Sequence, residues 1–303
     1  MNDPATTAAL DQLVVLRGRP RDVQELPGGL TNVNLRVTLD DRDVVVRQVR
    51  SDSGLLAIDR AAEHANTLAA AEAGVGAGVV EHRPELGMTV LEFLQGRTLT
   101  EADFHDPAVL ARAADAVRRL HAGPRFVNEF DMFARQRWYR EVVGEHGFPL
   151  PPTYDDHAAA WENVRRVLTA TAGPTVPCNN DLLAGNFIDD GEQVWLIDYD
   201  YSGNNDPCFE LGNTSTECEF DPDLTRAWVA AYFERDDPRL LARVRLQALC
   251  SEYGWSLWGF IQAGSSPLDF DFHAWGMHRF EKAARTFTSP DFPRLLDEVG
   301  SGA

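Results

Sequence analysis

The chain of 303 residues is poor in positive charge, and lysine is almost absent from it. Lysine and arginine total 28 residues against 47 aspartates and glutamates, which gives a formal net charge of −19, and Lys282 is the single lysine. Such a surface repels nucleic acids and anionic membranes, so neither is an expected partner. A cation that holds a phosphate elsewhere in the chain must therefore be an arginine, and a small cationic substrate would suit the acidic surface.

The features of a zinc protein, a secreted protein or a membrane protein are also missing. The cysteines are widely spaced and form no Cys-x-x-Cys pair, so we expect reduced, buried thiols at Cys178, Cys208, Cys218 and Cys250. No apolar run is long enough to span a bilayer, and the first residues lack the charged and apolar regions of a signal peptide. We therefore predict a cytoplasmic protein.

Three common catalytic motifs are absent. The sequence contains no G-x-x-x-x-G-K-[ST] phosphate loop, no G-x-S-x-G nucleophile elbow and no H-E-x-x-H zinc motif. These absences exclude P-loop nucleotide-binding enzymes and the commoner hydrolases and zinc enzymes, as far as motifs can exclude them.

One stretch, residues 176–203, is rich in acids and amides between short apolar segments. Asp181 and Asn186 lie in predicted turns, and a predicted strand at residues 194–197 leads into Asp198 and Asp200. Such oxygens suit a hard cation, and phosphoryl transfer uses a base and two metal ligands in this order. A solvated β-hairpin is the alternative, because Asp and Asn favour turns on their own account.

A glycine turn near the N-terminus is a candidate phosphate site. It lies at the head of a predicted hairpin with strands at residues 33–38 and 44–46, and it consists of Gly28, Gly29, Leu30, Thr31 and Asn32. Glycine lets the backbone approach a phosphate closely, although a Gly-Gly pair is also common in ordinary turns.

Arg47 closes the second strand of this hairpin, and Glu63 lies early in a strong predicted helix over residues 58–72 that stops at Gly74. Protein kinases hold the ATP phosphates with a strand cation paired to a helix glutamate, and their cation is lysine. Because this half of the chain has no lysine, Arg47 is the natural occupant. The alternative is that the two are unrelated surface charges.

The composition changes from strand-rich to helix-rich near residues 95–96. Before this point we expect a short helix and an entering strand over residues 10–23, and strands at 74–80 and 88–93. After it we expect helices at residues 107–121, 132–145, 155–172, 223–235, 238–263 and 268–286. We predict a nucleotide-binding lobe at residues 1–95 and a catalytic and substrate-binding lobe at residues 96–303. Glu92 and Leu94, beside the connector, would offer backbone groups to an adenine edge.

Together these motifs resemble the choline/ethanolamine kinases, within the aminoglycoside phosphotransferase group of protein-kinase-like folds. The resemblance runs from about residue 26 to about residue 280, and arginine is typical of the family at the position of Arg47. It implies an α+β, bilobal protein-kinase-like fold, with an N-terminal antiparallel β-sheet lobe that has one main helix and a larger, mostly helical C-terminal lobe. It also implies ATP and Mg²⁺ as cofactors.

The resemblance implies a role for each matching residue. Asp181 would be the catalytic base, and Asn186, Asp198 and Asp200 would hold the metal, although Asp200 stands where these kinases usually have glutamate and would reach it through water. Nucleotide binding would fall to Gly28, Gly29, Leu30, Thr31, Asn32, Arg47, Glu63, Glu92 and Leu94. Asn179 replaces the usual histidine, and its amide can brace the same loop.

The C-terminal segment resembles the amino-alcohol site of the same family. Trp255 and Trp258 are three residues apart, so on a helix they share a face that attracts a quaternary ammonium ion. The family places a carboxylate near the amine at the position of Glu217, and Phe272 and Trp275 are candidates for further walls. A tryptophan-rich core helix is the alternative.

The acceptor and the catalytic competence stay open at this point. Choline is the first expectation, and ethanolamine, an aminoglycoside, thiamine or an amino sugar are alternatives with the same fold. Asn179 motivates a different class, a nucleotide-binding relative with weak or no catalysis. The sequence is compatible with a monomer or a dimer.

Overall fold

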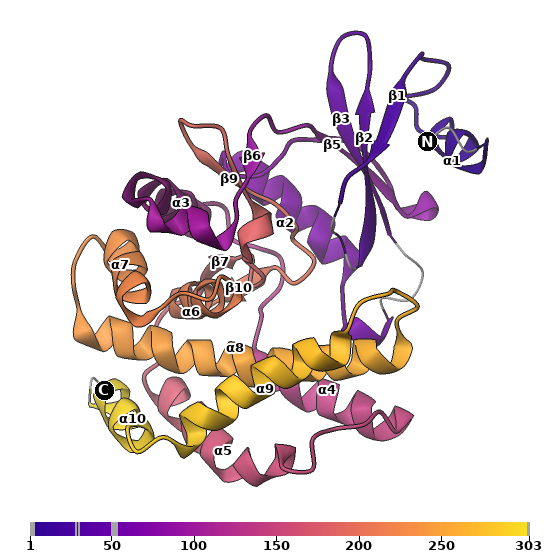
Figure 1. Cartoon of the computed structure of the whole chain (residues 1–303). Coiled ribbons are helices and arrows are strands. Elements are labelled where there is room, and N and C mark those ends of the chain that lie inside the picture. Colours follow the sequence, from indigo (N-terminus) through magenta and orange to yellow (C-terminus); the bar gives the residue numbers. More distant parts are fainter. Residues whose placement is uncertain (1–3, 28, 30, 50–53, 302–303) are drawn as a thin grey trace.

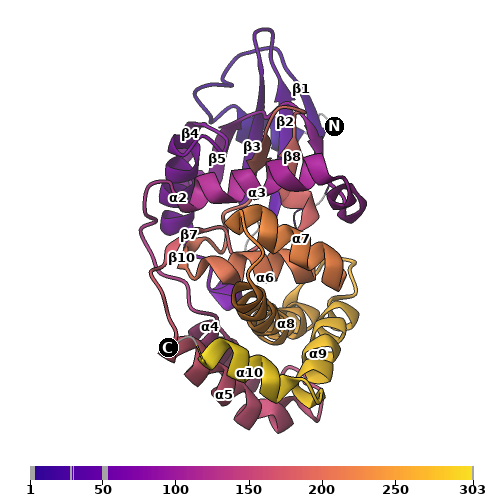
Figure 2. The same cartoon turned by 90° about the vertical axis from the view of Figure 1, so that its left-hand side faces the viewer.

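The computed structural model describes residues 4–27, 29, 31–49 and 54–301. An antiparallel sheet with helix α2 forms the N-terminal part, and a larger part built mainly of helices follows it (Figures 1 and 2). This confirms the predicted α+β architecture, whereas the lobe boundary at residues 95–96 stays a prediction. In the described part of the chain, no helix has the length and apolarity that crossing a membrane requires.

The N-terminal sheet has five strands in the order β1-β2-β3-β5-β4, and every neighbouring pair is antiparallel. The strands are β1 (Asp22–Glu25), β2 (Asn32–Thr38), β3 (Asp43–Val49), β4 (Val79–Arg83) and β5 (Met88–Glu92). The predicted hairpin is confirmed as β2 and β3, whose register pairs Val37 with Val44. Both valines are fully buried because the alternating pattern turns one face of the sheet toward an apolar core.

Helix α2 (Arg60–Glu72) begins after Asp59, whose side chain accepts hydrogen bonds from the backbone amides of Ala61 and Ala62. It ends before Gly74, which has φ +72°, as its sequence predicts. The strand predicted at residues 74–80 is wrong over most of its length, because β4 begins only at Val79. Gly76 and Gly78 in this segment weaken a strand.

One prediction at the N-terminus also needs correction. The helix expected within residues 10–23 lies earlier, as α1 (Pro4–Leu10), because proline is favoured in a first helical turn. Leu13 and Leu16 follow it in turns and pack with Leu10 against the sheet. Their apolar spacing therefore reflects burial rather than a continuous helix.

The helical part contains α3 (Pro107–His121), α4 (Met132–His146), α5 (Ala158–Ala170), α6 (Pro207–Glu217), α7 (Pro222–Phe233), α8 (Pro238–Ser265), α9 (Phe272–Thr288) and α10 (Phe292–Gly300). The six predicted helices are confirmed with small shifts of their ends; α9 starts late because Asp271 caps it. Helices α6 and α10 were missed. Helix α6 is buried on all sides and so lacks the polar face that marks a surface helix, and α10 is short.

Two small sheets shape the loops between α5 and α6. In one, β7 (Val176–Cys178) pairs with β10 (Gly203–Asn205); in the other, β8 (Phe187–Asp189) lies between β6 (Arg97–Thr98) and β9 (Val194–Leu196). The β7 and β10 pairing sets Cys178 opposite Gly203. It therefore brings the loop after β7 next to the loop before β10.

Helix α8 is the axis of the helical part, and α4, α6 and α9 surround it (Figure 2). Helices α6 and α8 approach closely at Gly212, where an added Cβ atom would lie 2.6 Å from the carbonyl oxygen of Val244 and 2.6 Å from the amide nitrogen of Ala248. These are backbone atoms, so they cannot move aside separately. The two helices can pack this closely because residue 212 has no side chain.

We predict that Gly212→Ala lowers the free energy of unfolding by about 2 kcal/mol or more, because the new methyl group overpacks the contact between α6 and α8. Chemical denaturation followed by circular dichroism measures the change. The matched control is Gly144→Ala in α4, where an added Cβ meets nothing within 4 Å; it should be neutral or stabilising by up to about 1 kcal/mol. Equal effects of the two substitutions would contradict the packing argument.

Candidate active site

A cavity of about 780 Å³ lies between the N-terminal sheet and the loops that follow β7. Its wall includes five of the predicted nucleotide-binding residues, which are Gly29, Arg47, Glu63, Glu92 and Leu94. The predicted metal ligands Asn186 and Asp198 also line it. Gly28 and Leu30 lie outside the described residues.

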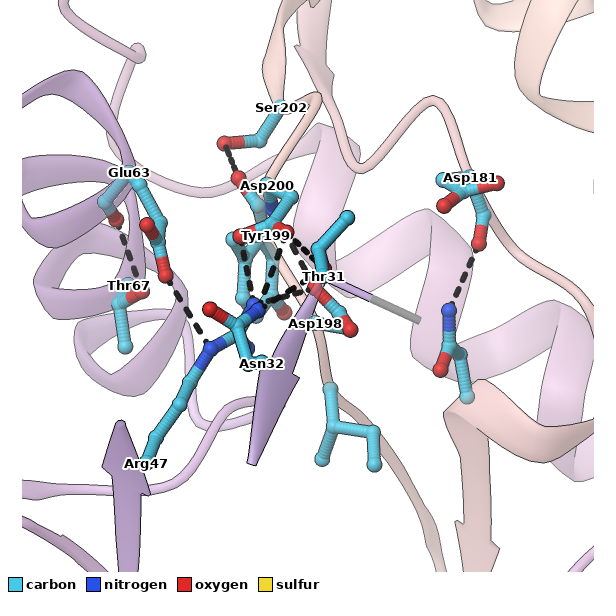
Figure 3. A network of polar contacts seen from close by, with 12 residues as sticks. Thr31, Asn32, Arg47, Glu63, Thr67, Asp181, Asp198, Tyr199, Asp200 and Ser202 are labelled. Atoms are coloured by element: carbon cyan, nitrogen blue, oxygen red, sulfur yellow. Dashed lines mark hydrogen bonds and ion pairs between the residues drawn. The ribbon is translucent and has the colours of Figure 1, made fainter. Parts of the chain in front are cut away.

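Arg47 is the centre of the polar network in this cavity (Figure 3). Its Nε lies 3.4 Å from Glu63 Oε1, and its Nη2 donates to Asp198 Oδ1 at 2.7 Å and to Asp200 Oδ1 at 2.6 Å. The expected ion pair with Glu63 is therefore present. Burial alone would lower the pKa of the Arg47 guanidinium. The neighbouring carboxylates have the larger combined effect, and the pKa is raised. Arg47 is a permanent cation.

Asp200 is enclosed by hydrogen-bond donors. Its Oδ1 accepts from Arg47 and from Arg60 Nη1 at 2.7 Å, and its Oδ2 accepts from Thr31 Oγ1 at 2.7 Å and Asn32 Nδ2 at 3.1 Å. These bonds join the predicted phosphate loop to β3, to α2 and to the segment after β9. A metal ion would have to compete with four donors for Asp200, so contact through water is the easier arrangement.

Asp198 and Asn186 are better placed to bind a cation. Asp198 has φ +63°, and among the described residues no hydrogen bond reaches its Oδ2. Asn186 donates Nδ2–H to the carbonyl oxygen of Asp181 at 2.8 Å, which leaves its Oδ1 free as a ligand. Burial raises the pKa of Asp198 against the opposing effect of Arg47. The Oδ2 of Asp198 and the Oδ1 of Asn186, which accept no hydrogen bond from the described residues, are a donor set that fits Mg²⁺.

Asp181 lies apart from the Arg47 network (Figure 3). Within the described chain, no side chain or amide donates a hydrogen bond to its carboxylate. Burial, followed by the charges of Glu217, Asp198 and Asp200, raises the pKa of Asp181, and Arg279 opposes this shift. The carboxylate therefore accepts no hydrogen bond from the described residues, and a nearby cation or a hydroxyl donor would stabilise its charged form.

The loop that carries Asp181 is held by Asn179. Its Nδ2 donates to the carbonyl oxygens of Ile197 at 3.1 Å and Asp198 at 2.9 Å, while its Oδ1 accepts the amide of Asp181 at 3.1 Å. Asparagine thus makes the bracing contacts expected at this position. One amide side chain fixes the distance between the loop of Asp181 and the segment of Asp198.

Glu210 on α6 is a residue that sequence reasoning missed. It is fully buried, and its carboxylate accepts the backbone amides of Asn179 at 2.5 Å and Asn180 at 2.8 Å. His121 and Cys178 lie beside it, and the potential ligand atoms of the three side chains lie within 4.8 Å of one another. The sequence does contain a signal for Glu210, because it is the one charged residue between residues 207 and 216.

The predicted tryptophan pair is buried, and both rings contact Tyr201. The Trp255 ring lies 4.8 Å from the Tyr201 ring, and Trp258 Nε1 donates to the Tyr201 hydroxyl at 2.7 Å. Trp258 also lies 5.1 Å from Trp275 and 5.7 Å from Phe272, measured between ring centroids. The structure thus groups all four predicted aromatic residues and adds Tyr201.

Glu217 is paired with an arginine that was not predicted. Arg279 on α9 hydrogen-bonds to Glu217, and its guanidinium carbon lies 3.6 Å from the centroid of the Trp275 ring. Both charged side chains are at least nine-tenths buried. One face of Trp275 and the carboxylate of Glu217 are therefore occupied by a cation of the chain itself.

Comparison with known proteins places this geometry in a family. The model of the phosphotransferase enzyme family matches residues 22–246. Ethanolamine kinase 1 from Mus musculus is 26% identical over 87% of this chain and 84% of its own length.

Solved structures agree. The crystal structure of a choline/ethanolamine kinase family protein from Mesorhizobium loti is 32% identical, with a TM-score of 0.88 over 99% of both chains. Choline kinase LicA from Streptococcus pneumoniae shares the fold, with a TM-score of 0.81 at 21% identity over 94% of this chain and 99% of its own. The chain belongs to the phosphotransferase enzyme family and, within it, to the choline/ethanolamine kinase family.

Proposed function

We propose that the protein transfers the γ-phosphate of ATP to the hydroxyl group of choline or a similar amino alcohol. The observation that carries this proposal is the placement of an unengaged Asp181 carboxylate beside the cavity lined by Arg47, Asn186 and Asp198. Structural neighbours support the choice of nucleotide, since LicA was solved with AMP and an aminoglycoside phosphotransferase with ATP and streptomycin.

In this proposal the residues of the chain act mainly by positioning and by charge. Arg47 and the loop that ends in Thr31 and Asn32 hold the phosphates, while Asp181 accepts a hydrogen bond from the acceptor hydroxyl and takes its proton late in the transfer. Asn186 and Asp198 would hold Mg²⁺, which when bound neutralises the developing charge on the phosphate oxygens. Glu92 and Leu94 line the cavity where the adenine would lie.

The acceptor would bind at the far side of Asp181, between the aromatic cluster and Glu217. Glu217 is close enough to Asp181 for its charge to raise the pKa of the Asp181 carboxyl. The carboxylate of Asp181, which no described side chain pairs, favours a cationic acceptor, and in this proposal a methylated ammonium ion contacts the ring of Trp258, which is 6% exposed.

One observation favours ethanolamine as a second candidate. Because Arg279 covers a face of Trp275, fewer aromatic surfaces remain for three methyl groups than a complete aromatic cage would offer. A primary ammonium depends more on carboxylates and less on rings. A screen of ATP consumption with choline, ethanolamine, aminoglycosides, thiamine and amino sugars tests the acceptor and the alternative of a non-catalytic relative.

We predict that Asp181→Ala lowers kcat by about 10²- to 10⁴-fold, because the acceptor hydroxyl loses its general base. The dissociation constant for Mg-ATP should change little, since Asp181 does not line the nucleotide cavity. Phosphorylated product is measured by coupled assay and nucleotide binding by calorimetry. The control is Glu192→Ala, an exposed acid in the same segment, and a kcat for Asp181→Ala equal to this control would refute the role of Asp181.

We predict that Trp258→Leu raises the KM for choline by about tenfold or more, because a cation–π interaction between a desolvated cation and the indole ring contributes about 2 kcal/mol. The effect on the KM for ethanolamine should be smaller. Trp195→Leu, a half-buried tryptophan on β9, is the matched control, and melting temperatures report on folding. An unchanged KM for choline in a folded Trp258→Leu protein would remove Trp258 from the acceptor site.

We predict that Asn179→Ala lowers kcat by about tenfold or more, because it removes two hydrogen bonds from the Asp181 loop to the Asp198 segment and a third within the loop itself. Asn179→His should retain more activity, since a ring N–H can replace one of the donated bonds. Steady-state kinetics of the two variants give the comparison. If alanine and histidine were equally active, Asn179 would not be a positioning residue.

A further inference from the structure

Lys282, the single lysine, takes no part in the candidate active site. It lies on α9 in the wall of a second cavity, of about 340 Å³, formed by α8, α9 and α10. We call this cavity the α8–α10 pocket. It shares no lining residue with the nucleotide cavity, and α10 lies at the end of the helical part remote from the N-terminal sheet (Figure 1).

The pocket is basic although the chain is acidic. Four of its lining residues are cations, and they are Arg245, Lys282, Arg285 and Arg294. Its three acids already have partners in the wall. Glu252 accepts from Thr216 Oγ1 at 2.8 Å and lies 3.7 Å from Lys282 Nζ.

Arg294 lies 3.5 Å from Asp291 and 3.9 Å from Glu298, so it accounts for the two remaining acids. Unlike Arg294, the side chains of Arg245 on α8 and Arg285 on α9 have no ion pair or hydrogen bond in the part of the chain that the structure describes. Both guanidinium groups are therefore available to a ligand in this one cavity.

The chemistry of the wall selects the ligand. Each guanidinium presents a planar fork of N–H donors that matches a phosphate or carboxylate, and Lys282 adds a point charge. The ammonium of Lys282 is held in place by Glu219 at 3.1 Å and the carbonyl oxygen of Thr216 at 3.4 Å. Phe292 and Leu295, both buried, give the pocket an apolar side.

We propose that the α8–α10 pocket binds a small phosphate monoester. The dianionic phosphate lies between Arg245 and Arg285 with Lys282 nearby, and the organic part of the ester lies against Phe292 and Leu295. A volume of about 340 Å³ fits such a ligand. The same phosphate chemistry is available from a soluble metabolite and from a lipid with a terminal phosphate group.

The test is a calorimetric titration with glycerol 3-phosphate at low ionic strength, with Mg-ADP in excess so that the nucleotide cavity does not contribute. The dissociation constant should rise by about tenfold or more in the double variant Arg245→Ala/Arg285→Ala, because bonds between charged groups are lost. Arg239→Ala is the matched control, since Arg239 is an exposed arginine of α8 outside the pocket, and it should bind like the wild type. Both substituted arginines are exposed, so folding should be retained, and melting temperatures check this.

Two further arms complete the experiment. Sedimentation with phosphatidylcholine vesicles that contain phosphatidic acid distinguishes a lipid source from a soluble one, and in either case binding must be lost in the double variant. A titration with citrate, an anion that carries carboxylates and no phosphate, tests whether the pocket prefers a phosphate group. The proposal is overturned if the wild type binds neither glycerol 3-phosphate nor the vesicles, if the double variant binds as well as Arg239→Ala, or if citrate binds as tightly as the phosphate ester.

Discussion

The structure of the candidate site depends on the charge of Arg47, a buried guanidinium shared between the sheet, α2 and the segment after β9. A buried cation is costly unless carboxylates surround it, and removal of one partner would leave the others uncompensated. The fork of Arg47 points Nε toward Glu63 and Nη2 toward Asp198 and Asp200. It is therefore suited to bridging separate elements, and Asp200 extends the connection to Thr31 and Asn32.

A second buried acid, Glu210, holds the loop of Asp181. Glu210 accepts two consecutive backbone amides, and Asn180, between Asn179 and Asp181, has φ +66°. Asparagine adopts this left-handed conformation more readily than most residues other than glycine, and the contacts of the loop hold it there. Glu210 supplies those contacts from α6, which in turn packs closely on α8 through Gly212. The position of Asp181 is thus set by helix packing as well as by the loop sequence.

The parts of the fold that could be predicted are those with local signals. The hairpin of β2 and β3, helix α2 with its Gly74 stop, and the surface helices follow from alternation, stop signals and periodicity. Helix α6 could not be found in this way because it is buried on every side. Similarly, the pair of Arg47 and Glu63 followed from motif order, whereas the bonds of Glu210 to Asn179 and of Arg279 to Glu217 join residues 31 and 62 positions apart. Such long-range pairs have no local pattern.

The acceptor side shows why a matching set of residues does not by itself define specificity. Trp258, Phe272 and Trp275 lie together, and their role in acceptor binding stays a prediction; the guanidinium of Arg279 lies on Trp275 and is paired with Glu217. An incoming ammonium ion must either displace this arginine or use the aromatic and carboxylate surfaces that it leaves free. Because Arg279 also opposes the raised pKa of Asp181, its displacement would raise the pKa of that carboxylate further. Recognition of the acceptor cation and the charge state of Asp181 are therefore linked through one side chain.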